Sequence, residues 1–191
     1  MPGDSATTPS GQSGSPQGGS PPPHRRRWHW SFDLALAIAV FVGLQAWLTR
    51  DVVRGALPAI DAPLVNASTA TAHDWRLAQG RDGFLLYVWA GWCAICKTIE
   101  GSVDAVSGSA PLLTVAMQSG TPAEVAAALT QRGLHWPTLV DPTGALSRDL
   151  GVDAVPTLIF IGRHGAVRSV TQGYTTKLGI RARLWWMRRF G

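Results

Sequence analysis

The sequence predicts an α/β domain with a mixed central sheet flanked by helices, preceded by a disordered tail and one transmembrane helix. Two observations support this prediction. From about residue 57 onward, short apolar runs typical of buried strands alternate with longer segments typical of helices. Before residue 50 the composition differs, because a stretch rich in Gly, Ser and Pro is followed by an apolar stretch.

Residues 1–27 are predicted to form a disordered cytoplasmic tail with a basic end. The first 24 residues are nearly all Gly, Ser, Pro, Thr and Gln and include no aromatic residue. Such a segment cannot bury enough apolar surface to offset the entropy lost on ordering. The tail ends in Arg25, Arg26 and Arg27. Positive charge beside an apolar span favours the cytoplasmic side of a membrane, so we expect the N-terminus to stay inside.

Residues 28–49 are predicted to form a single transmembrane anchor. Asp33 is their only charged residue, and an uncharged stretch follows it. This stretch is somewhat shorter than the ~20 residues that a span needs, but Trp28, Trp30 and Trp47 suit the two membrane interfaces and complete it.

A cleaved signal peptide is the competing interpretation of this segment. The residues after Leu48 offer no good pair of small residues for cleavage, so an uncleaved anchor is favoured. We therefore expect a single-pass protein of the inner membrane. A linker would occupy residues 50–60, and residues 61–191 would form a domain in the periplasm, where disulfides persist.

The domain is expected to start with a lead-in that holds one short strand and a helix around His73 to Ala78. Apolar runs, caps and turn residues predict the elements that follow. In chain order these are strand 84–89, a helix after Cys93, strand 112–117, a helix capped by Thr121 with Pro122 at its first position, a turn over 141–144, a hairpin of strands 157–161 and 166–171 around Arg163-His164-Gly165, and a C-terminal helix.

Cys93 and Cys96 are the only cysteines of the chain. They follow a predicted strand and open a predicted helix, so the first thiol lies beside unpaired amides at a helix N-terminus, which favour its thiolate. The second thiol, one turn later, can attack a mixed disulfide that the first one forms. Thiol:disulfide exchange is therefore the leading hypothesis, with Cys93 attacking and Cys96 resolving.

A Cys-x-x-Cys pair also occurs in metal sites and in structural disulfides. A metal site needs two further soft ligands, and the five histidines are scattered singly, so no metal ligands are assigned. A structural disulfide between the two cysteines closes a loop of only two intervening residues. It would remove little entropy from the unfolded chain and so stabilise the fold poorly. Two thiolates alone can bind Cu(I), so a copper-binding protein without turnover stays open as an alternative.

A second motif lies downstream of the cysteines. Val155-Pro156-Thr157 opens an apolar run, and proline is tolerated at the first position of a strand but not inside a central one. The order of strand, Trp-Cys-x-x-Cys-Lys, helix and Val-Pro-Thr before a strand resembles the thioredoxin fold. The resemblance implies a cis Pro156 beside the cysteine pair and a Val155 backbone that pairs with substrate. It implies no cofactor.

Two further segments resemble narrower groups. Trp136 to Gly144 resembles the inserted strand-turn-helix of the TlpA/ResA-like branch, with Trp in place of Phe. The segments 116–120 and Leu184-Trp185-Trp186 resemble the thioredoxin-like proteins of the bacterial suppressor-of-copper-sensitivity group. These resemblances imply a membrane-anchored reductase that exchanges disulfides with exported proteins and draws on a transmembrane electron donor. Ala94-Ile95 does not set the direction of electron flow, so an isomerase or oxidant stays open.

Residues around the pair receive expected roles. Trp92 would pack beside the cysteines and restrict which partners approach, with Val155 and Pro156 forming the substrate-side shelf. Lys97 would either stabilise the thiolate by its charge or be a solvated charge on the helix. The buried acid of thioredoxin falls at Tyr87, which does not titrate near neutral pH. Glu100, one turn after Cys96, would accept the proton of the buried thiol.

The charge balance argues against nucleic acid as a partner. The net charge is +5, but residues 51–191 hold 13 basic and 10 acidic residues, and basic and aromatic residues mix only at the C-terminus. There we expect Trp185 and Trp186 to pack on the sheet, with a helix resting on a membrane as the alternative. A tethered interaction module without turnover is the structural alternative to an enzyme.

Overall fold

The computed structural model describes residues 24–55, 57, 62–66, 83–162 and 165–190, with side chains from residue 32 onward. Two units are described separately. The first, Met1–Val40, holds most of helix α1, and the second, Phe41–Gly191, holds the end of that helix and the α/β domain.

Helix α1 spans His24–Leu48. It covers nearly all of the predicted anchor and begins inside the predicted tail, whose first 23 residues lie outside the described part of the chain. Many of its large apolar side chains are exposed: Phe32, Leu34, Leu36, Ile38, Val40, Phe41, Val42, Leu44 and Trp47. By length and apolarity together, no helix among the described residues qualifies as a membrane span.

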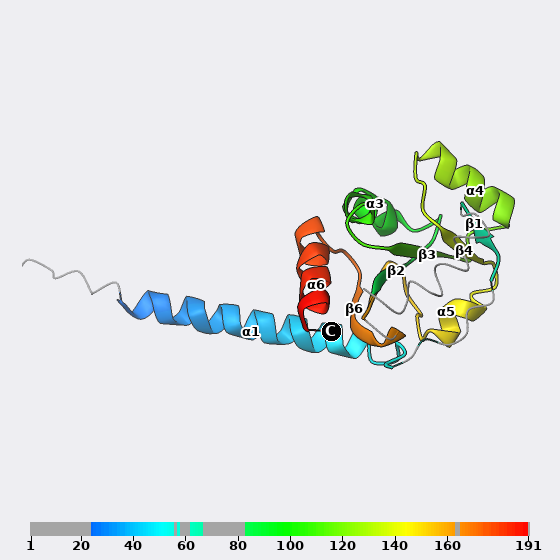
Figure 1. The fold of residues 1–191 in the computed structure, drawn as a ribbon. Coiled ribbons are helices and arrows are strands. Elements are labelled where there is room, and N and C mark those ends of the chain that lie inside the picture. Colours follow the sequence, from blue (N-terminus) through cyan, green and yellow to red (C-terminus); the bar gives the residue numbers. More distant parts are fainter. Residues whose placement is uncertain (1–23, 56, 58–61, 67–82, 163–164, 191) are drawn as a thin grey trace, which may run out of the picture. The chain divides into compact units, whose positions relative to one another are not determined.

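The domain is built on a six-stranded mixed sheet of order β1-β4-β3-β2-β5-β6 (Figure 1). The strands are β1 Leu64–Val65, β2 Phe84–Trp89, β3 Leu112–Met117, β4 Thr138–Asp141, β5 Thr157–Ile161 and β6 Val167–Gln172. The pairs β2–β3 and β3–β4 are parallel, and the other pairs are antiparallel. The predicted mixed sheet is confirmed, including its C-terminal hairpin and a short strand in the lead-in.

Within the described part of the domain, four helices accompany the sheet: α3 Ala94–Ser107, α4 Pro122–Gln131, α5 Ala145–Asp149 and α6 Lys177–Phe190. The predicted start of α4 is confirmed, because the Thr121 hydroxyl accepts the Glu124 amide at 3.4 Å and the Glu124 carboxylate accepts the Thr121 amide at 2.7 Å. These bonds hold the pKa of Glu124 below its usual value. The helix expected around His73 to Ala78 lies outside the described residues.

Strand β2 shows why the sheet has helices on both faces. All six of its residues are buried. Leu85, Tyr87 and Trp89 pack into one core with α3, α4 and α6, whereas the alternate residues pack into a second core with α5 and its neighbours. Because successive side chains point to opposite faces, a strand covered on both sides carries a continuous apolar run.

Part of the predicted linker packs on this domain. Val52 is buried in the second core, and the Val53 amide donates to the Leu150 carbonyl at 3.1 Å. Gly151 has φ +69, and a Cβ there would meet the backbone of Asp51. A side chain is therefore excluded at Gly151 by conformation and by space. The folded domain extends upstream of residue 61 to at least Asp51.

Helix α6 corrects one expectation. The prediction that Trp185 and Trp186 pack on the sheet is wrong, since each is 62% exposed. The helix buries Ile180, Leu184 and Met187 instead. These three positions recur every three to four residues and so share one face, which turns the two tryptophans away from the sheet.

Candidate active site

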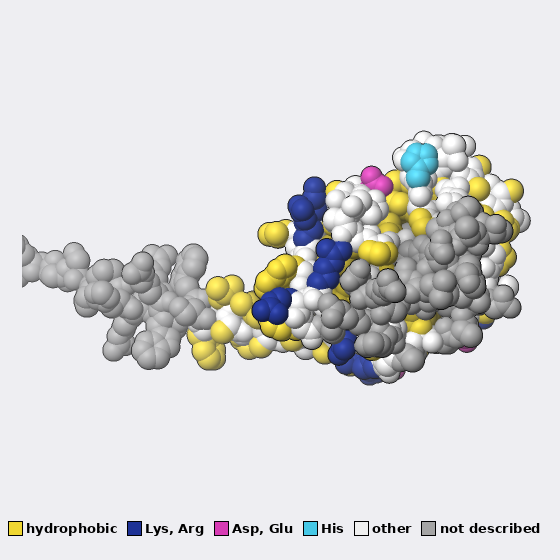
Figure 2. Space-filling view, viewed as in Figure 1, with side chains coloured by type: hydrophobic (Ala, Val, Ile, Leu, Met, Phe, Trp, Pro, Cys, Tyr) yellow, Lys and Arg dark blue, Asp and Glu magenta, His cyan; other side chains and the backbone are white. Residues whose placement is uncertain are grey.

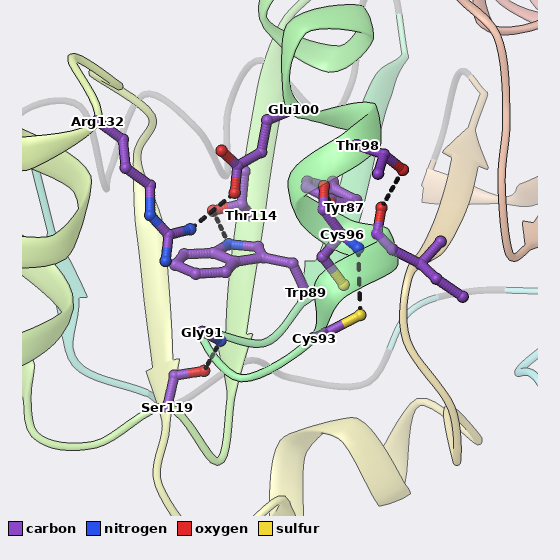
Figure 3. Close-up of polar contacts among 11 residues, drawn as sticks. Tyr87, Trp89, Gly91, Cys93, Cys96, Thr98, Glu100, Thr114, Ser119 and Arg132 are labelled. Carbon is purple, nitrogen blue, oxygen red and sulfur yellow. Dashed lines mark hydrogen bonds and ion pairs between the residues drawn. The ribbon is translucent and has the colours of Figure 1, made fainter.

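The two cysteines lie where β2 passes into α3, as the sequence predicts. Cys93 is the residue that caps α3, with extended backbone angles (φ −83, ψ 111), and its sulfur accepts the Cys96 amide at 3.2 Å (Figure 3). The preceding turn is held by the Gly91 amide, which donates to the Ser119 hydroxyl at 2.9 Å. A sulfur in this position faces the positive end of the helix dipole, which stabilises a thiolate.

The two thiols have different environments. Both are free, and Cys93 retains 7% of its surface whereas Cys96 retains none. Burial raises the pKa of Cys96 to about 12, and its hydrogen bond with Cys93 acts in the same direction. The side chains of Trp92 and Ile95, on either side of Cys93, are 64% and 51% exposed. A protein partner therefore meets Cys93 first, between two exposed apolar side chains.

The Val155–Pro156 segment lies against the first thiol. Its peptide bond is cis, as the resemblance implies. The Cys93 thiol donates to the Val155 carbonyl at 3.6 Å, and the Pro156 carbonyl accepts the Gly173 amide at 2.8 Å. These contacts join three parts of the chain that are far apart in sequence. The structure thus brings Val155 and Pro156 to Cys93, where the predicted shelf requires them.

Trp92 is held by the loop that follows β3. Its indole Nε1 donates to the Gln118 carbonyl at 3.2 Å. Gln118 has φ +47, and its amide donates to the Asp141 carbonyl at 2.8 Å. The indole is therefore exposed yet fixed in position next to Cys93. Its expected role in partner selection stays a prediction.

Glu100 forms an ion pair. Its carboxylate accepts Nη1 of Arg132 at 2.7 Å, and the guanidinium of Arg132 lies 5.6 Å from the ring centre of Trp89 (Figure 3). Arg132 is not predicted from the sequence, because no local pattern links residues 32 positions apart. The carboxylate thus has a cationic partner. Its expected role as the proton acceptor for Cys96 stays a prediction.

Tyr87 lies beneath the buried thiol and was assigned no role from the sequence. Its hydroxyl donates to the Cys96 carbonyl at 3.4 Å, and the ring of Trp136 packs edge-on against its ring at 5.8 Å. Burial first, and then the neighbouring Cys96, raise the pKa of Tyr87 far above its usual value. The phenol is therefore a neutral hydrogen-bond donor under physiological conditions. Tyr87 precedes Trp89 by two residues on β2 and so shares its face of the strand. This spacing is the sequence feature that could have placed Tyr87 in the site.

A chain of hydrogen bonds completes the floor of the site. Nε1 of Trp89 donates to the Thr114 hydroxyl at 3.1 Å, Thr114 contacts the Thr138 hydroxyl at 2.7 Å, and Thr138 donates to the Trp136 carbonyl at 3.0 Å. Every member has a partner, so this buried polar group across β2, β3 and β4 carries no desolvation penalty for an unpaired atom.

The predicted turn over 141–144 is also confirmed. The buried carboxylate of Asp141 accepts the Ser147 amide at 2.9 Å and its hydroxyl at 2.8 Å, which anchors the start of α5. Gly144 supplies the left-handed residue of the turn, with φ +72. Among the residues described here, no group of three His, Cys, Asp or Glu side chains is arranged to hold a metal ion.

Comparison with known proteins places this site in a family. The family model described as "AhpC/TSA family" matches residues 56–170. The chain belongs to the AhpC/TSA family. The matched range contains both cysteines and Pro156, so the family likeness covers the whole constellation described above.

Curated relatives of this AhpC/TSA family member have related names. A "Thioredoxin-like protein" of Haemophilus influenzae is 29% identical over 160 residues, covering 78% of this chain and 95% of the relative. A "Probable thiol:disulfide interchange protein DsbE-2" of Pasteurella multocida is 28% identical over 139 residues, covering 71% and 72%. These relatives support a thiol:disulfide oxidoreductase of the thioredoxin-like type.

Solved structures support the fold. A thiol-disulfide isomerase from Corynebacterium glutamicum is similar with a TM-score of 0.61 and 14% identity, covering 72% of this chain and 98% of that one. At this identity the likeness concerns the fold alone. Two structures described as a thioredoxin-like protein and a thioredoxin-like superfamily protein are similar too, with TM-scores of 0.61 and 0.60 at 16% identity, covering 71% and 72% of this chain and 96% and 98% of theirs. The thioredoxin-like fold predicted for this AhpC/TSA family member is confirmed.

Proposed function

We propose that Cys93 and Cys96 form the redox pair of a thiol:disulfide oxidoreductase that reduces disulfides in exported proteins. The observation that carries the proposal is the arrangement at the start of α3. The Cys93 sulfur accepts a helix N-terminal amide and contacts the Val155 carbonyl, and the buried Cys96 lies one turn behind it. An attacking thiol that still reaches the surface, in front of a resolving thiol that does not, is what this reaction needs.

The reaction proceeds in two exchanges. The Cys93 thiolate attacks one sulfur of a partner's disulfide, a mixed disulfide forms, and the other partner sulfur leaves as a thiolate that takes up a proton. Cys96 then loses its proton and attacks the Cys93 sulfur, which expels the second partner thiolate. The partner gains two electrons, and this chain is left with a Cys93–Cys96 disulfide. An external dithiol, which we assign to a transmembrane electron donor, reduces that disulfide again.

The surroundings of Cys96 also affect the step in which the electron donor reduces the Cys93–Cys96 disulfide. When the electron donor attacks Cys93 of the disulfide, Cys96 leaves as a thiolate. Burial raises the pKa of Cys96, and hydrogen bonding to Tyr87 opposes that effect. We expect the neutral Tyr87 hydroxyl, which donates to the Cys96 carbonyl in the reduced chain, to turn to the leaving thiolate and stabilise it in a site that otherwise disfavours charge.

Two single variants of the full-length chain test the redox proposal. Cys93→Ser should abolish the reduction of insulin disulfides, because the attacking sulfur is gone. Cys96→Ser should instead accumulate mixed disulfides with partners, because resolution is lost. If both variants retained full turnover, the redox proposal would fail.

We also propose that the chain is tethered to the inner membrane with its domain in the periplasm. Support comes from the exposed apolar side chains of α1 and from the arginine run at its start. A thiol reagent that cannot cross the inner membrane should label Cys93 in intact cells after gentle reduction. Protection of Cys93 until the inner membrane is permeabilised would refute this placement.

The copper-related alternatives are weaker. The resemblance to the suppressor-of-copper-sensitivity group rests on short segments, and neither the relatives' names nor a three-ligand cluster among the described residues supports a copper site. Competition of the reduced chain against a strong Cu(I) chelator tests this alternative. An interaction module without turnover predicts that a Cys93→Ser, Cys96→Ser double variant still captures partners.

A further inference from the structure

Helix α6 is apolar on two opposite sides. Its buried side consists of Ile180, Leu184 and Met187. On the outer side, Leu178, Trp185, Trp186 and Phe190 are all exposed large hydrophobic residues. A helix that covers a sheet normally presents polar residues to water, so the outer side of α6 is suited to a second apolar environment.

The outer aromatic residues form a cluster. The ring centres of Trp186 and Phe190 lie 4.5 Å apart, and those of Trp185 and Phe190 lie 6.2 Å apart at an angle of 82°. Beside them is a hollow of about 510 Å³, lined by Arg168, Ser169, Ala182, Arg183, Trp186, Met187 and Phe190. Tryptophan and phenylalanine gathered at one end of a helix are typical of segments that insert into the interfacial layer of a bilayer.

All charged side chains of α6, the helix that carries this cluster, are positive. Helix α6 contains Lys177, Arg181, Arg183, Arg188 and Arg189 and no acidic residue. Figure 2 shows dark blue basic and yellow apolar side chains interleaved where α6 lies in Figure 1. We call the outer side of α6, with its lysine and arginines and with Arg168 of β6, the aromatic-arginine surface.

We propose that the aromatic-arginine surface binds the surface of an anionic lipid bilayer. Arginines attract anionic headgroups while the rings enter the boundary between headgroups and acyl chains. A second copy of this chain is a poorer occupant, because a two-fold contact through this surface would bring like charges together. The proposal is independent of the chemistry at Cys93.

The position of the surface gives this docking a consequence. Nη2 of Arg188 donates to the Ser109 carbonyl, just beyond the C-terminal end of α3, whereas Cys93 lies at the N-terminal end of that helix. The 14 residues of α3 extend about 20 Å at roughly 1.5 Å per residue. Docking through the aromatic end of α6 therefore places this contact at the opposite end of α3 from Cys93.

A fluorescent label at one position tests the docking. In the full-length Cys93→Ser, Cys96→Ser chain, Ala182→Cys places the only thiol on the exposed side of α6. Ala127→Cys is the matched control, since Ala127 is exposed on α4, and α4 contacts β1 at the far edge of the sheet from α6. Each is labelled with an environment-sensitive dye and mixed with vesicles of phosphatidylcholine, with or without about one quarter phosphatidylglycerol.

The label at 182 should shift its emission to the blue and become protected from an aqueous quencher, with the anionic vesicles only. The shift should disappear at about 0.5 M salt and in an Arg181→Glu, Arg189→Glu variant. The label at 127 should not respond, even where α1 attaches the chain to the vesicle. Because the label reports only its own surroundings, attachment by α1 alone does not mimic the result.

Four outcomes would overturn the proposal. The label at 182 remaining in water with anionic vesicles would exclude insertion of this surface. Equal shifts at 182 and 127 would show unspecific adsorption, and equal shifts with neutral and anionic vesicles would exclude recognition by charge. A concentration-dependent shift at 182 without any vesicle would identify a second copy of the chain as the occupant.

Discussion

The two thiols should differ sharply in reactivity, and the Cys93→Ser variant isolates the buried one. In this variant Cys96 is the only thiol, and burial, the main cause of its raised pKa, is unchanged because an oxygen replaces the neighbouring sulfur. Burial raises the pKa of Cys96 from 9.0 toward the value of about 12 that it has beside Cys93, so the thiolate fraction at pH 7 falls from roughly 10⁻² toward roughly 10⁻⁵.

The assay is alkylation by iodoacetamide followed by mass spectrometry. At pH 7, Cys96 in the folded Cys93→Ser chain should react more than tenfold and up to about a thousandfold more slowly than in the same chain unfolded by urea, because only the thiolate reacts. The rate should then rise about tenfold per pH unit and continue to rise above pH 9. The Cys96→Ser chain, in which Cys93 is the only thiol and keeps some exposed surface, is the comparison for labelling of the less buried position.

The shape of the pH profile decides between two explanations of slow labelling. Burial that merely blocks the reagent would lower the rate at every pH and leave a plateau near pH 9. A plateau near that pH would therefore refute the claim that the site disfavours the Cys96 thiolate. Labelling of Cys96 at pH 7 within tenfold of the unfolded chain would refute it as well.

Four further predictions follow from the same contacts. Tyr87→Phe should slow reduction of the disulfide roughly tenfold, because a hydrogen bond to a leaving thiolate is lost; stopped-flow reduction by dithiothreitol measures this, and unchanged rates would remove Tyr87 from the reaction. The reduced chain should lose up to about 4 kcal/mol of stability between pH 9 and 12, measured by urea unfolding. The reason is that Cys96 deprotonates first in the unfolded chain, whereas the folded chain retains its proton. The oxidised chain should show no such loss from this thiol. Val52→Ala should lower the free energy of unfolding by about 2 kcal/mol, because two buried methyl groups are removed, whereas the partly exposed Val53→Ala should cost less; equal costs would contradict the assignment of Val52 to the core. Glu100→Gln should slow resolution of trapped mixed disulfides and flatten its pH dependence if the carboxylate takes the proton of Cys96, and an unchanged profile would leave Glu100 as an ion-pair partner only.

The sequence by itself determined most of the secondary structure in the described part of the domain, and the location of its thiols. Strands 84–89 and 112–117 were predicted with the bounds that the structure shows, because strands buried on both faces appear as continuous apolar runs. The cap at Thr121 and the turn at Asp141 were predicted from contacts between residues close in the chain. The cis bond before Pro156 was implied by the resemblance and is present.

Only the tertiary structure decided which distant residues meet at the site. Arg132 reaches Glu100 from another helix, and Tyr87 lies under Cys96 because β2 packs against α3. The burial of Val52 and the exposure of Trp185 were likewise not predicted. Apolar character alone does not show which surface, if any, covers a residue. Local patterns depend on neighbours along the chain, whereas these contacts depend on the order of strands and the packing of helices, which bring together residues that no local spacing relates.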